Sequence, residues 1–374
     1  MKKTIINFIL LFSMVFNSWC YPADDWELTS LTESQIDQEK FTKLINYVFD
    51  AKYKTNSLLI IHRGKILVEQ YENEFSRDDL QRLWSITKTI SGLLLGIATQ
   101  EGYISVEQKI ENLISQAPSD YKAIGISDLF QMSSGIEFNE DYQNPLTSDT
   151  IQMLFGPASH DAGKYVLSLS TNLKPGQQFH YSSGDTNLLM YLLKNAIIGK
   201  TGDIQNYLDF PWKKLFEPIG IKNAVFETDE SKTFLGSTYL YLSARDLARI
   251  AYLIMNQGRW ENQQVVPAEW IKQTLNLAPS FAETKLSERE EDDTYGGQIW
   301  LNRSYYSNAK QKQISKGIPT ASEETFLMRG YAGQYVIVIP ERKLILIRLA
   351  TEDKHRMDKN KMVELMLDSF KAVP

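Results

Sequence analysis

The segment from Leu83 to Ala98 constrains this chain more than any other, because it combines an apolar helix with a single ionisable side chain. Its apolar residues fall on every side of a helix, at positions 86, 90, 93, 94, 95, 97 and 98. No polar face is therefore left that could carry a charge into water. Lys88 is the only ionisable residue between Ser85 and Ala98. The fold must surround this helix and also provide a partner for the Lys88 amine.

Ser85 stands three residues before Lys88, on the same helical face, so the hydroxyl and the amine could touch. The same Ser-x-x-Lys spacing recurs at Ser119 and Ser307, where polar neighbours indicate a solvated surface. Only the first copy opens a long apolar helix. Burial disfavours a charged amine, and a neutral Lys88 could help to remove the Ser85 proton. The alternative is a lysine that snorkels to the surface beside a serine that caps the helix.

The first twenty residues have the layout of a secretory signal peptide. Lys2 and Lys3 precede an apolar run at 5–16, and polarity rises from residue 21 onwards. The run is too short to span a bilayer. We therefore predict cleavage after Cys20 and export to the periplasm or the medium. The alternative is a lipid anchor on Cys20, which the bulky Trp19 before it fits poorly.

Composition excludes several other classes of protein. Cys20 is the only cysteine, so residues 21–374 contain no disulfide and no thiolate metal site. A chain of 374 residues, 43% hydrophobic, can bury a large core without such links. The net charge of -6, without a long basic run, argues against nucleic acid as a partner. Four scattered histidines show no metal-ligand spacing. We expect no metal, no cofactor and no later membrane helix, and the oligomeric state stays open.

Strand-like segments gather at the two ends of the mature chain, with helical segments between them. Residues 56–71 and 335–349 predict β-hairpins, 294–301 one further strand, and 359–371 a helix. Helical patterns occupy the middle, at 85–101, 126–132, 185–198, 204–216, 244–257 and 268–277. The charged stretch 283–293 is expected to be a solvated surface loop.

We therefore predict one α+β domain over 21–374. Strands from both ends form one antiparallel sheet flanked by helices, in a subdomain made of 21–80 and 294–374. Residues 81–293 form an inserted helical subdomain. A cleft between the two parts would hold the start of the buried helix.

Two later segments offer partners to Ser85. Tyr181 opens the run Tyr181-Ser182-Ser183 on a turn just before a predicted helix. In the segment 329–335, two glycines stand before a predicted strand, where a backbone can approach a ligand closely. In this order, Ser-x-x-Lys, Tyr-x-Ser and the glycine-containing strand opening resemble the penicillin-binding and class C β-lactamase-related serine hydrolases. The likeness is greatest to the 6-aminohexanoate-dimer hydrolase and esterase-like branch. It extends from about residue 55 to the C-terminus, through the segments 58–71, 126–136, 236–249 and 258–270.

The resemblance implies a β-lactamase/transpeptidase-like fold and an acyl-enzyme mechanism. Ser85 would attack an ester or amide carbonyl, and water would then cleave the acyl-enzyme. Lys88 and Tyr181 would share the proton relay, with either residue as the general base. By the same analogy, the backbone N–H groups of Ser85 and Gln334 would form the oxyanion hole.

The expected substrate-binding residues are Tyr142, Ser183, Tyr331 and Gly333. Ser183 replaces the asparagine of class C β-lactamases and lacks the combined donor and acceptor of an amide. Tyr331 stands where the family usually has lysine or histidine, so a cationic contact is missing there. Tyr142 matches a substrate-contacting loop tyrosine of the amide-hydrolase branch. We expect a small ester or a linear amide as substrate. The alternatives are β-lactams or peptidoglycan peptides and, from another class, a catalytically silent binding protein on the same fold.

Overall fold

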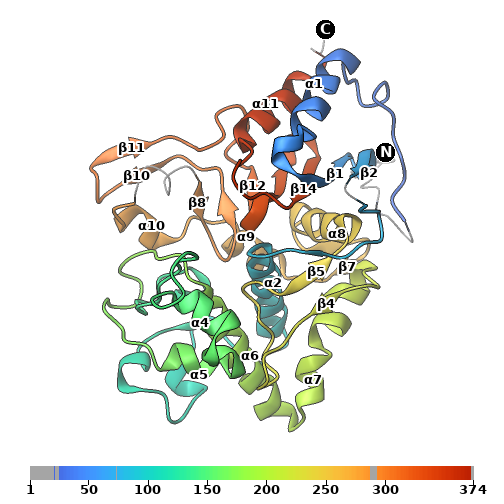
Figure 1. The fold of residues 1–374 in the computed structure, drawn as a ribbon. Helices are drawn as coiled ribbons and strands as arrows, with labels where there is room; N and C mark the ends of the chain where they lie inside the picture. Colours follow the sequence, from blue (N-terminus) through green and yellow to red (C-terminus); the bar gives the residue numbers. More distant parts are fainter. Residues whose placement is uncertain (1–20, 22–24, 73, 287–292, 372–374) are drawn as a thin grey trace, which may run out of the picture.

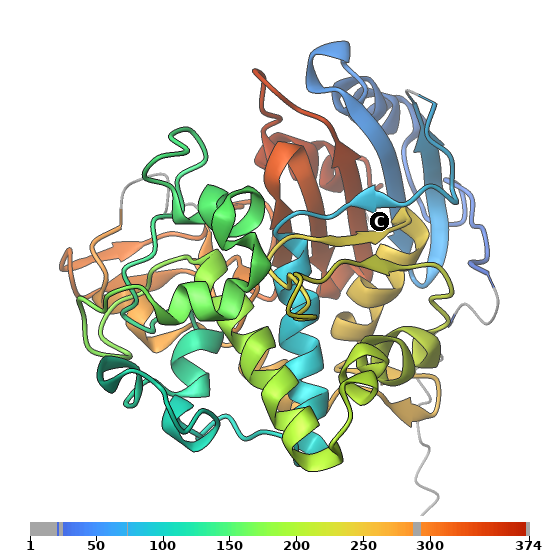
Figure 2. The same ribbon diagram turned by 60° about the horizontal axis from the view of Figure 1, so that its bottom comes forward.

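A seven-stranded antiparallel sheet joins the two ends of the chain in the computed structural model, which describes residues 21, 25–72, 74–286 and 293–371 (Figures 1 and 2). The predicted signal peptide and Cys20 lie outside these residues. In spatial order the strands are β2 (Lys65–Tyr71), β1 (Thr55–His62), β14 (Leu344–Ala350), β13 (Gln334–Ile339), β12 (Phe326–Gly330), β9 (Trp300–Leu301) and β8 (Thr294–Tyr295). The predicted α+β fold, with one sheet built from both chain ends, is confirmed.

Alternate side chains of the central strands face two different cores. Leu58 and Ile60 of β1 pack together with helices α1 (Gln38–Val48) and α11 (Lys359–Asp368). Leu59 and Ile61 belong to the core that contains α8 (Ala244–Met255), which contacts β1 and β14. Because β2 and β14 also pair with its two edges, every residue of β1 is buried. The sheet is thus a firm support for the segment between β12 and β13.

The helical part is built around α2 (Ile86–Gln100), which contacts α6, α9 and β12. All α2 residues from Ile86 to Ala98 are buried, so the predicted central helix is confirmed. Gly96 lets Trp270 approach, since a Cβ at Gly96 would lie 2.3 Å from the indole Cδ1. The other helices here are α3 (Ile126–Phe130), α4 (Asp149–Phe155), α5 (Ala162–Leu167), α6 (Ser183–Thr201), α7 (Ile204–Leu208), α9 (Ala268–Thr274) and α10 (Pro279–Glu283).

Three small sheets complete the secondary structure of the described residues. One orders β3 (Gln81–Arg82), β5 (Leu240–Leu242) and β4 (Val225–Phe226), and the others pair β6 (Arg259–Trp260) with β7 (Gln263–Gln264) and β10 (Tyr305–Ser307) with β11 (Lys312–Ile314). In the first of these sheets, β3 ends at Arg82, shortly before α2 begins at Ile86.

Two predicted elements are wrong in the same way, because each is interrupted. The expected strand at 294–301 is a hairpin in which β8 pairs antiparallel with β9, Thr294 opposite Leu301. The expected helix at 204–216 ends as α7 at Leu208, and a separate π-helical turn follows at Trp212–Phe216. Pro211 stands between the two and lacks the N–H that a continuous α-helix requires.

The charged stretch 283–293 is also not simply a solvated loop. Glu283 is the last residue of α10, and Asp293 is buried at the other end, where its carboxylate pairs with Arg329 and Lys359. Residues 287–292 lie outside the described part of the chain. Two cationic partners explain why Asp293 tolerates burial.

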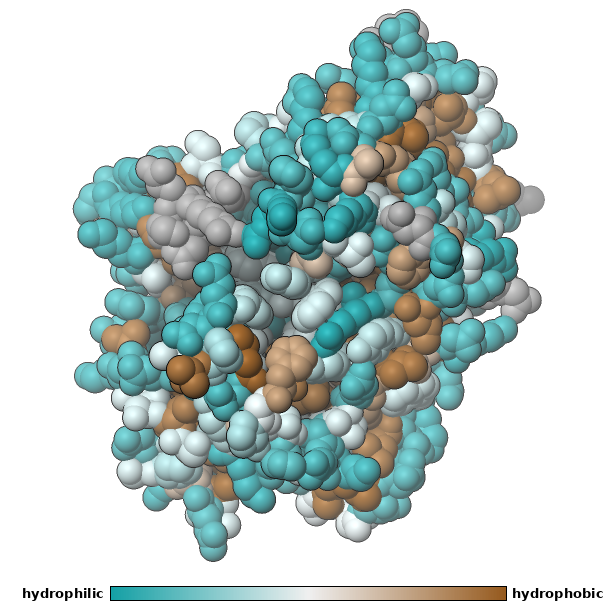
Figure 3. All heavy atoms as spheres, in the orientation of Figure 1, coloured by the Kyte–Doolittle hydropathy of each residue, from teal (hydrophilic) through white to brown (hydrophobic). Residues whose placement is uncertain are grey.

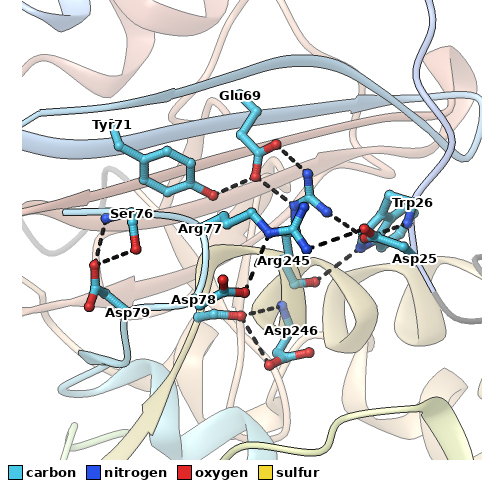
Figure 4. A network of polar contacts seen from close by, with 11 residues as sticks. Asp25, Trp26, Glu69, Tyr71, Ser76, Arg77, Asp78, Asp79, Arg245 and Asp246 are labelled. Atoms are coloured by element: carbon cyan, nitrogen blue, oxygen red, sulfur yellow. Dashed lines mark hydrogen bonds and ion pairs between the residues drawn. The ribbon is translucent and has the colours of Figure 1, made fainter.

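A polar network fastens the segment that follows the predicted leader (Figure 4). Arg245, in the first turn of α8, donates to both carboxylate oxygens of Glu69 at 2.6 and 2.5 Å and also pairs with Asp25. The indole of Trp26 donates to the Arg245 carbonyl at 3.2 Å. The segment that contains Asp25 and Trp26 is therefore bound to both α8 and β2.

On the face shown in Figure 3, brown apolar residues are scattered among more numerous polar ones. Within the described residues, the helices are all too short or too polar to cross a membrane.

Candidate active site

Ser85 stands on a tight turn between β3 and the central helix. The Leu83 N–H donates to the Leu240 carbonyl at 2.9 Å, and the chain then turns at Trp84, whose φ is 51°. Left-handed backbone at a non-glycine residue is uncommon and often marks functional sites. Ser85 is the N-cap of α2, yet its hydroxyl makes no capping hydrogen bond. The alternative of a capping serine is therefore wrong, and the hydroxyl can serve Lys88 and the cavity that Ser85 lines.

Lys88 reaches three oxygens inside the protein. Its side chain is only 1% exposed, so the alternative of a snorkelling lysine is wrong as well. Nζ lies 2.9 Å from Ser183 Oγ, 3.2 Å from the Ser237 carbonyl oxygen and 3.3 Å from Ser85 Oγ. A neutral amine could donate its two hydrogens to Ser183 and Ser237 and keep its lone pair for the Ser85 hydroxyl. The arrangement thus suits an amine that accepts the serine proton.

Tyr181 lies immediately before α6 and lines the same cavity as Ser85. Its ring centroid is 4.9 Å from Lys88 Nζ. The ring stacks on Trp300 with 5.3 Å between centroids and meets the edge of Tyr295 at 5.8 Å. Two aromatic neighbours from the sheet side therefore fix the tyrosine beside the lysine, and the three predicted catalytic residues lie together.

Glu140 extends this group behind Ser183. The Ser183 hydroxyl donates to Glu140 Oε1 at 2.6 Å, and the Ser183 N–H donates to Oε2 at 2.7 Å. Because that hydroxyl donates to the carboxylate, it accepts from Lys88. A polar chain thus runs from Ser85 through Lys88 and Ser183 to Glu140, and the predicted substrate contact of Ser183 is placed beneath the cavity, with 1% of its surface exposed.

The residues expected on the oxyanion side surround the turn between β12 and β13. Gly333 lines the cavity with Ser85 and has φ of 84°. The amide side chain of Gln334 is turned into the protein, where it donates to the Ala350 carbonyl at 2.6 Å and accepts from the Ala350 N–H at 3.1 Å. Gln334 itself is buried and does not line the cavity, and it pairs with Gly330 in the β12–β13 ladder, so the oxyanion role of its N–H stays a prediction from the resemblance.

The cavity beside Ser85 has a volume of about 460 Å³. Two exposed tyrosines stand at it, Tyr142 at 46% and Tyr331 at 48% exposure, and their rings stack with 5.8 Å between centroids. Trp84 meets the edge of Tyr331 at 5.1 Å. Both tyrosines were predicted to bind substrate, and they come from opposite parts of the chain. Position 331 therefore presents an aromatic ring where the family usually has lysine or histidine, and the cations that line the cavity are Arg329 and Arg356.

The hydroxyl of Tyr142 points inward even though its ring is exposed. It donates to Glu140, and burial of the hydroxyl together with that carboxylate raises the pKa of Tyr142. Tyr142 therefore stays a neutral donor and fixes Glu140 in place.

A second cavity, of about 630 Å³, is larger, but fewer of the predicted site residues line it. It shares Tyr181 with the first, and its other lining residues include His180, whose Nε2 lies 2.8 Å from the Phe138 carbonyl oxygen. Ser85 does not line it. The smaller cavity, which contains the nucleophile, is the candidate active site.

Asp185 adds an unusual carboxyl group two residues beyond Ser183. It is completely buried, and this burial raises the pKa of Asp185 to about 8, although a hydrogen bond of 2.7 Å from the Ser134 hydroxyl favours the charged form. Below that pH the side chain is neutral, so it adds no charge to the first turn of α6.

Sequence reasoning missed Glu140, Trp300 and the Ser237 carbonyl. Glu140 and Trp300 line the cavity, and Ser237 binds Lys88. A signal existed only for Glu140, because it stands two residues before Tyr142. Ser237 and Trp300 are distant from Ser85 in the sequence, and the fold brings them to the site. No local sequence pattern predicts that proximity.

Comparison with known proteins gives a consistent result. The sequence pattern of the Beta-lactamase family matches residues 44–369. The 6-aminohexanoate-dimer hydrolase of Paenarthrobacter ureafaciens is 25% identical over 232 residues, which are 59% of this chain and 57% of that protein. The chain thus matches a little over half the length of this curated relative.

Solved structures share the fold over most of the chain. A hydrolase with promiscuous acyltransferase activity, EstCE1, superimposes with a TM-score of 0.66 at 11% identity, covering 90% of this chain and 98% of that one. The octameric penicillin-binding protein homologue from Pyrococcus abyssi gives a TM-score of 0.61 at 18% identity, covering 87% and 77%. At these identities the likeness shows a common fold.

Proposed function

The chain belongs to the Beta-lactamase family, and on that premise we propose that it is an exported serine hydrolase that cleaves a small ester or a linear amide through an acyl-enzyme on Ser85. The observation that carries this proposal is the contact of the buried Lys88 amine with Ser85 Oγ, 3.3 Å apart, beside Tyr181 at one cavity. Nucleophile and base within reach of one another are what acyl transfer requires.

In the first half of the reaction, Ser85 Oγ attacks the carbonyl carbon and its proton passes to the Lys88 amine. The carbonyl oxygen becomes an oxyanion, which the backbone N–H groups of Ser85 and Gln334 stabilise. The bond to the alcohol or amine then breaks, and the leaving group takes up the proton by way of Tyr181. In the second half, water adds to the acyl carbon and gives a proton to Lys88, the bond between that carbon and Ser85 Oγ breaks, and Lys88 passes the proton to Ser85 Oγ as the acid is released.

The cavity favours a neutral or apolar acyl group. Tyr331 and Tyr142 offer aromatic faces, which suit apolar or planar groups, and Ser183 is occupied by Lys88 and Glu140. A β-lactam would find neither the asparagine nor the lysine or histidine that the family usually has at positions 183 and 331, although Arg329 and Arg356 do line the cavity. The curated relative is named for the hydrolysis of a 6-aminohexanoate dimer, which supports an amide as substrate.

Hydrolysis of p-nitrophenyl butyrate, a linear aminohexanoate dimer and a chromogenic cephalosporin, each by wild type and by Ser85→Ala, tests the proposal. We expect turnover of the ester or the amide above that of the cephalosporin, and loss of all turnover in the variant. Faster turnover of the cephalosporin would make the protein a β-lactamase. Equal activity of wild type and Ser85→Ala on every substrate would favour a binding protein on this fold.

Export is tested separately. After expression of the full chain in a Gram-negative host, we expect periplasmic protein whose N-terminal residue is Tyr21. A mature chain that begins with a lipid-modified Cys20 would replace secretion by membrane anchoring, and an unprocessed cytoplasmic chain would contradict export.

A further inference from the structure

Arg82 is a partly buried arginine that the proposed reaction does not use. It stands on β3, three residues before Ser85. Its guanidinium carbon lies over the Trp84 ring and over the Tyr239 ring, 4.0 Å from each centroid. Tyr239 is buried, and its hydroxyl donates to the Leu154 carbonyl at 3.4 Å. Tyr239 is therefore a fixed support, and Arg82 links it to Trp84.

Hydrogen bonding does not explain why an arginine occupies this place. Nε and Nη2 of Arg82 are buried and have no hydrogen-bond partner among the described residues. Buried donors without acceptors cost free energy, which an apolar side chain would avoid. A guanidinium is, however, well suited to attraction by two aromatic faces at once. The contribution of Arg82 is therefore its contact with the two rings.

Trp84 is the strained residue of the turn that presents Ser85. Its φ of 51° is left-handed, which is unfavourable for a residue with a Cβ. Such a conformation persists only where surrounding groups hold it in place. The Trp84 side chain contacts Arg82 and the edge of Tyr331, whose ring centroid is 5.1 Å from its own. Arg82 is thus one of the groups that hold the turn.

The conformation of Trp84 sets the position of Ser85. The Trp84 carbonyl accepts the Thr87 N–H at 3.0 Å, so the turn is joined to the first turn of α2. The Trp84–Ser85 peptide is trans, and in a planar trans peptide the carbonyl and the following N–H point in opposite directions. A rotation at Trp84 would therefore move the Ser85 N–H and also the hydroxyl that lies 3.3 Å from Lys88 Nζ.

We propose that Arg82 is a positioning residue that holds the Trp84 turn and thereby keeps Ser85 in the geometry of attack. Arg82 does not line the cavity that contains Ser85, so it acts through Trp84 and not on the substrate. The inference rests on the proposed function, because it concerns the nucleophile of that same site.

Arg249 offers a matched control for a role in stability alone. It is also buried, lies 5.8 Å from the centroid of the Trp260 ring and donates to the Ile219 carbonyl at 3.0 Å. Neither Arg249 nor Trp260 lines the cavity that contains Ser85. Arg249→Met therefore removes a buried arginine beside a tryptophan without touching the turn at Trp84.

The test is a double-mutant cycle of Arg82→Met and Trp84→Gly. Glycine adopts a left-handed φ without strain, so Trp84→Gly keeps the turn accessible and leaves Arg82 no ring to hold there. Urea unfolding first shows which variants are folded. Hydrolysis of p-nitrophenyl butyrate then gives kcat and KM, and the rate at which a fluorophosphonate labels Ser85 reports on the nucleophile itself.

We expect Arg82→Met to lower kcat and the labelling rate about 10- to 100-fold with KM within about threefold, because a displaced nucleophile slows attack more than binding. In the Trp84→Gly background the same substitution should change both rates less than about twofold. Arg249→Met should retain the wild-type kcat and labelling rate.

Two further variants keep the test decisive if a protein does not fold. Arg82→Lys replaces Arg82→Met, because lysine keeps the charge but lacks the planar group that lies over the rings. Tyr239→Leu replaces Trp84→Gly, because it removes the support behind Arg82. The substitution at Arg82 should then again have less than about a twofold effect in the Tyr239→Leu background.

Wild-type kcat and labelling rate in the folded Arg82 variant would overturn the inference. An equal fall in the wild-type and second-site backgrounds would also overturn it, because Arg82 would then act independently of the rings. A wild-type protein whose Ser85 does not react with a fluorophosphonate would instead overturn the proposed function. The two failures are therefore distinguishable.

Discussion

Two of the buried lysines, Lys88 and Lys194, have similar surroundings, and only one of them lies at a candidate active site. Lys88 on α2 has three oxygen partners and the Tyr181 ring 4.9 Å away. Lys194 on α6 is 7% exposed, with three oxygen partners at 2.6 to 3.0 Å and the Tyr191 ring 5.0 Å away. Burial and hydrogen bonding alone therefore do not distinguish a catalytic lysine from a structural one.

The difference lies in what the partners do. Lys194 binds Ser231 and Thr233, which belong to a turn held by the Asp229 carboxylate, and burial lowers the pKa of Lys194 while Asp229 opposes the shift. Lys88 instead binds Ser85, which lines a cavity and is free of any capping bond. A buried lysine becomes a candidate base when one of its partners is an accessible nucleophile.

The matched variants Lys88→Met and Lys194→Met test the difference between the two lysines most directly. We expect kcat/KM for the ester to fall about 10²- to 10⁴-fold in Lys88→Met, because general base catalysis is lost. Lys194→Met should keep kcat/KM within threefold and lose about 1–3 kcal/mol of unfolding free energy, because buried oxygens lose their donor. Steady-state kinetics and urea unfolding measure both. Equal loss of activity in the two variants would contradict the distinction.

A smaller effect is expected from the hydroxyl partners of the two lysines. Ser183→Ala removes the link between Lys88 and Glu140, and we expect kcat to fall about tenfold, which corresponds to about 1.4 kcal/mol. Thr233→Val removes the hydroxyl 2.6 Å from Lys194 and should lower stability by about 1 kcal/mol at wild-type kcat. If Ser183→Ala were fully active, the hydrogen bonds that link Ser85 through Lys88 and Ser183 to Glu140 would have no part in the reaction.

A further effect, on stability alone, concerns Asp185, which stands on the same helix as Lys194. The pKa of Asp185 is about 8 in the folded protein against an ordinary value of 3.8, so the folded state binds more protons between these values. The stability that this proton confers is present in full below pH 3.8 and is lost as the pH rises toward 8. Asp185→Asn should remove this slope and gain about 1 kcal/mol on wild type for each pH unit from 5 to 8.

Urea unfolding at pH 5, 6, 7 and 8 measures this difference between wild type and Asp185→Asn. A constant difference across that range would show that Asp185 ionises normally in the folded protein.

Local patterns were enough to predict the parts of the fold that depend on neighbouring residues. The apolar run around Lys88 could only be a central helix, and the hairpins at both ends followed from turn residues between apolar strands. Ser85, Lys88 and Tyr181 were found through spacing and the order of motifs, and the structure brings them together. Their roles stay predictions until they are measured.

Contacts between distant segments could not be predicted in this way. Glu140 meets Ser183 across 43 positions, and Arg348 reaches Thr55 across 293. The burial of Lys194 could not be predicted either, because a lysine on a helix usually faces water. The interruption at Pro211 was visible in the sequence, but the apolar periodicity on both sides outweighed it in the prediction.

In the proposed reaction Lys88 activates Ser85, whereas Lys194 has no such role. The most direct measurement treats wild type, Lys88→Met and Lys194→Met with a fluorophosphonate and locates the label by mass spectrometry of the peptides. We predict a label on Ser85 in wild type and Lys194→Met, and at least about 100-fold slower labelling in Lys88→Met. A label on another residue, or equal labelling rates in all three proteins, would contradict the account.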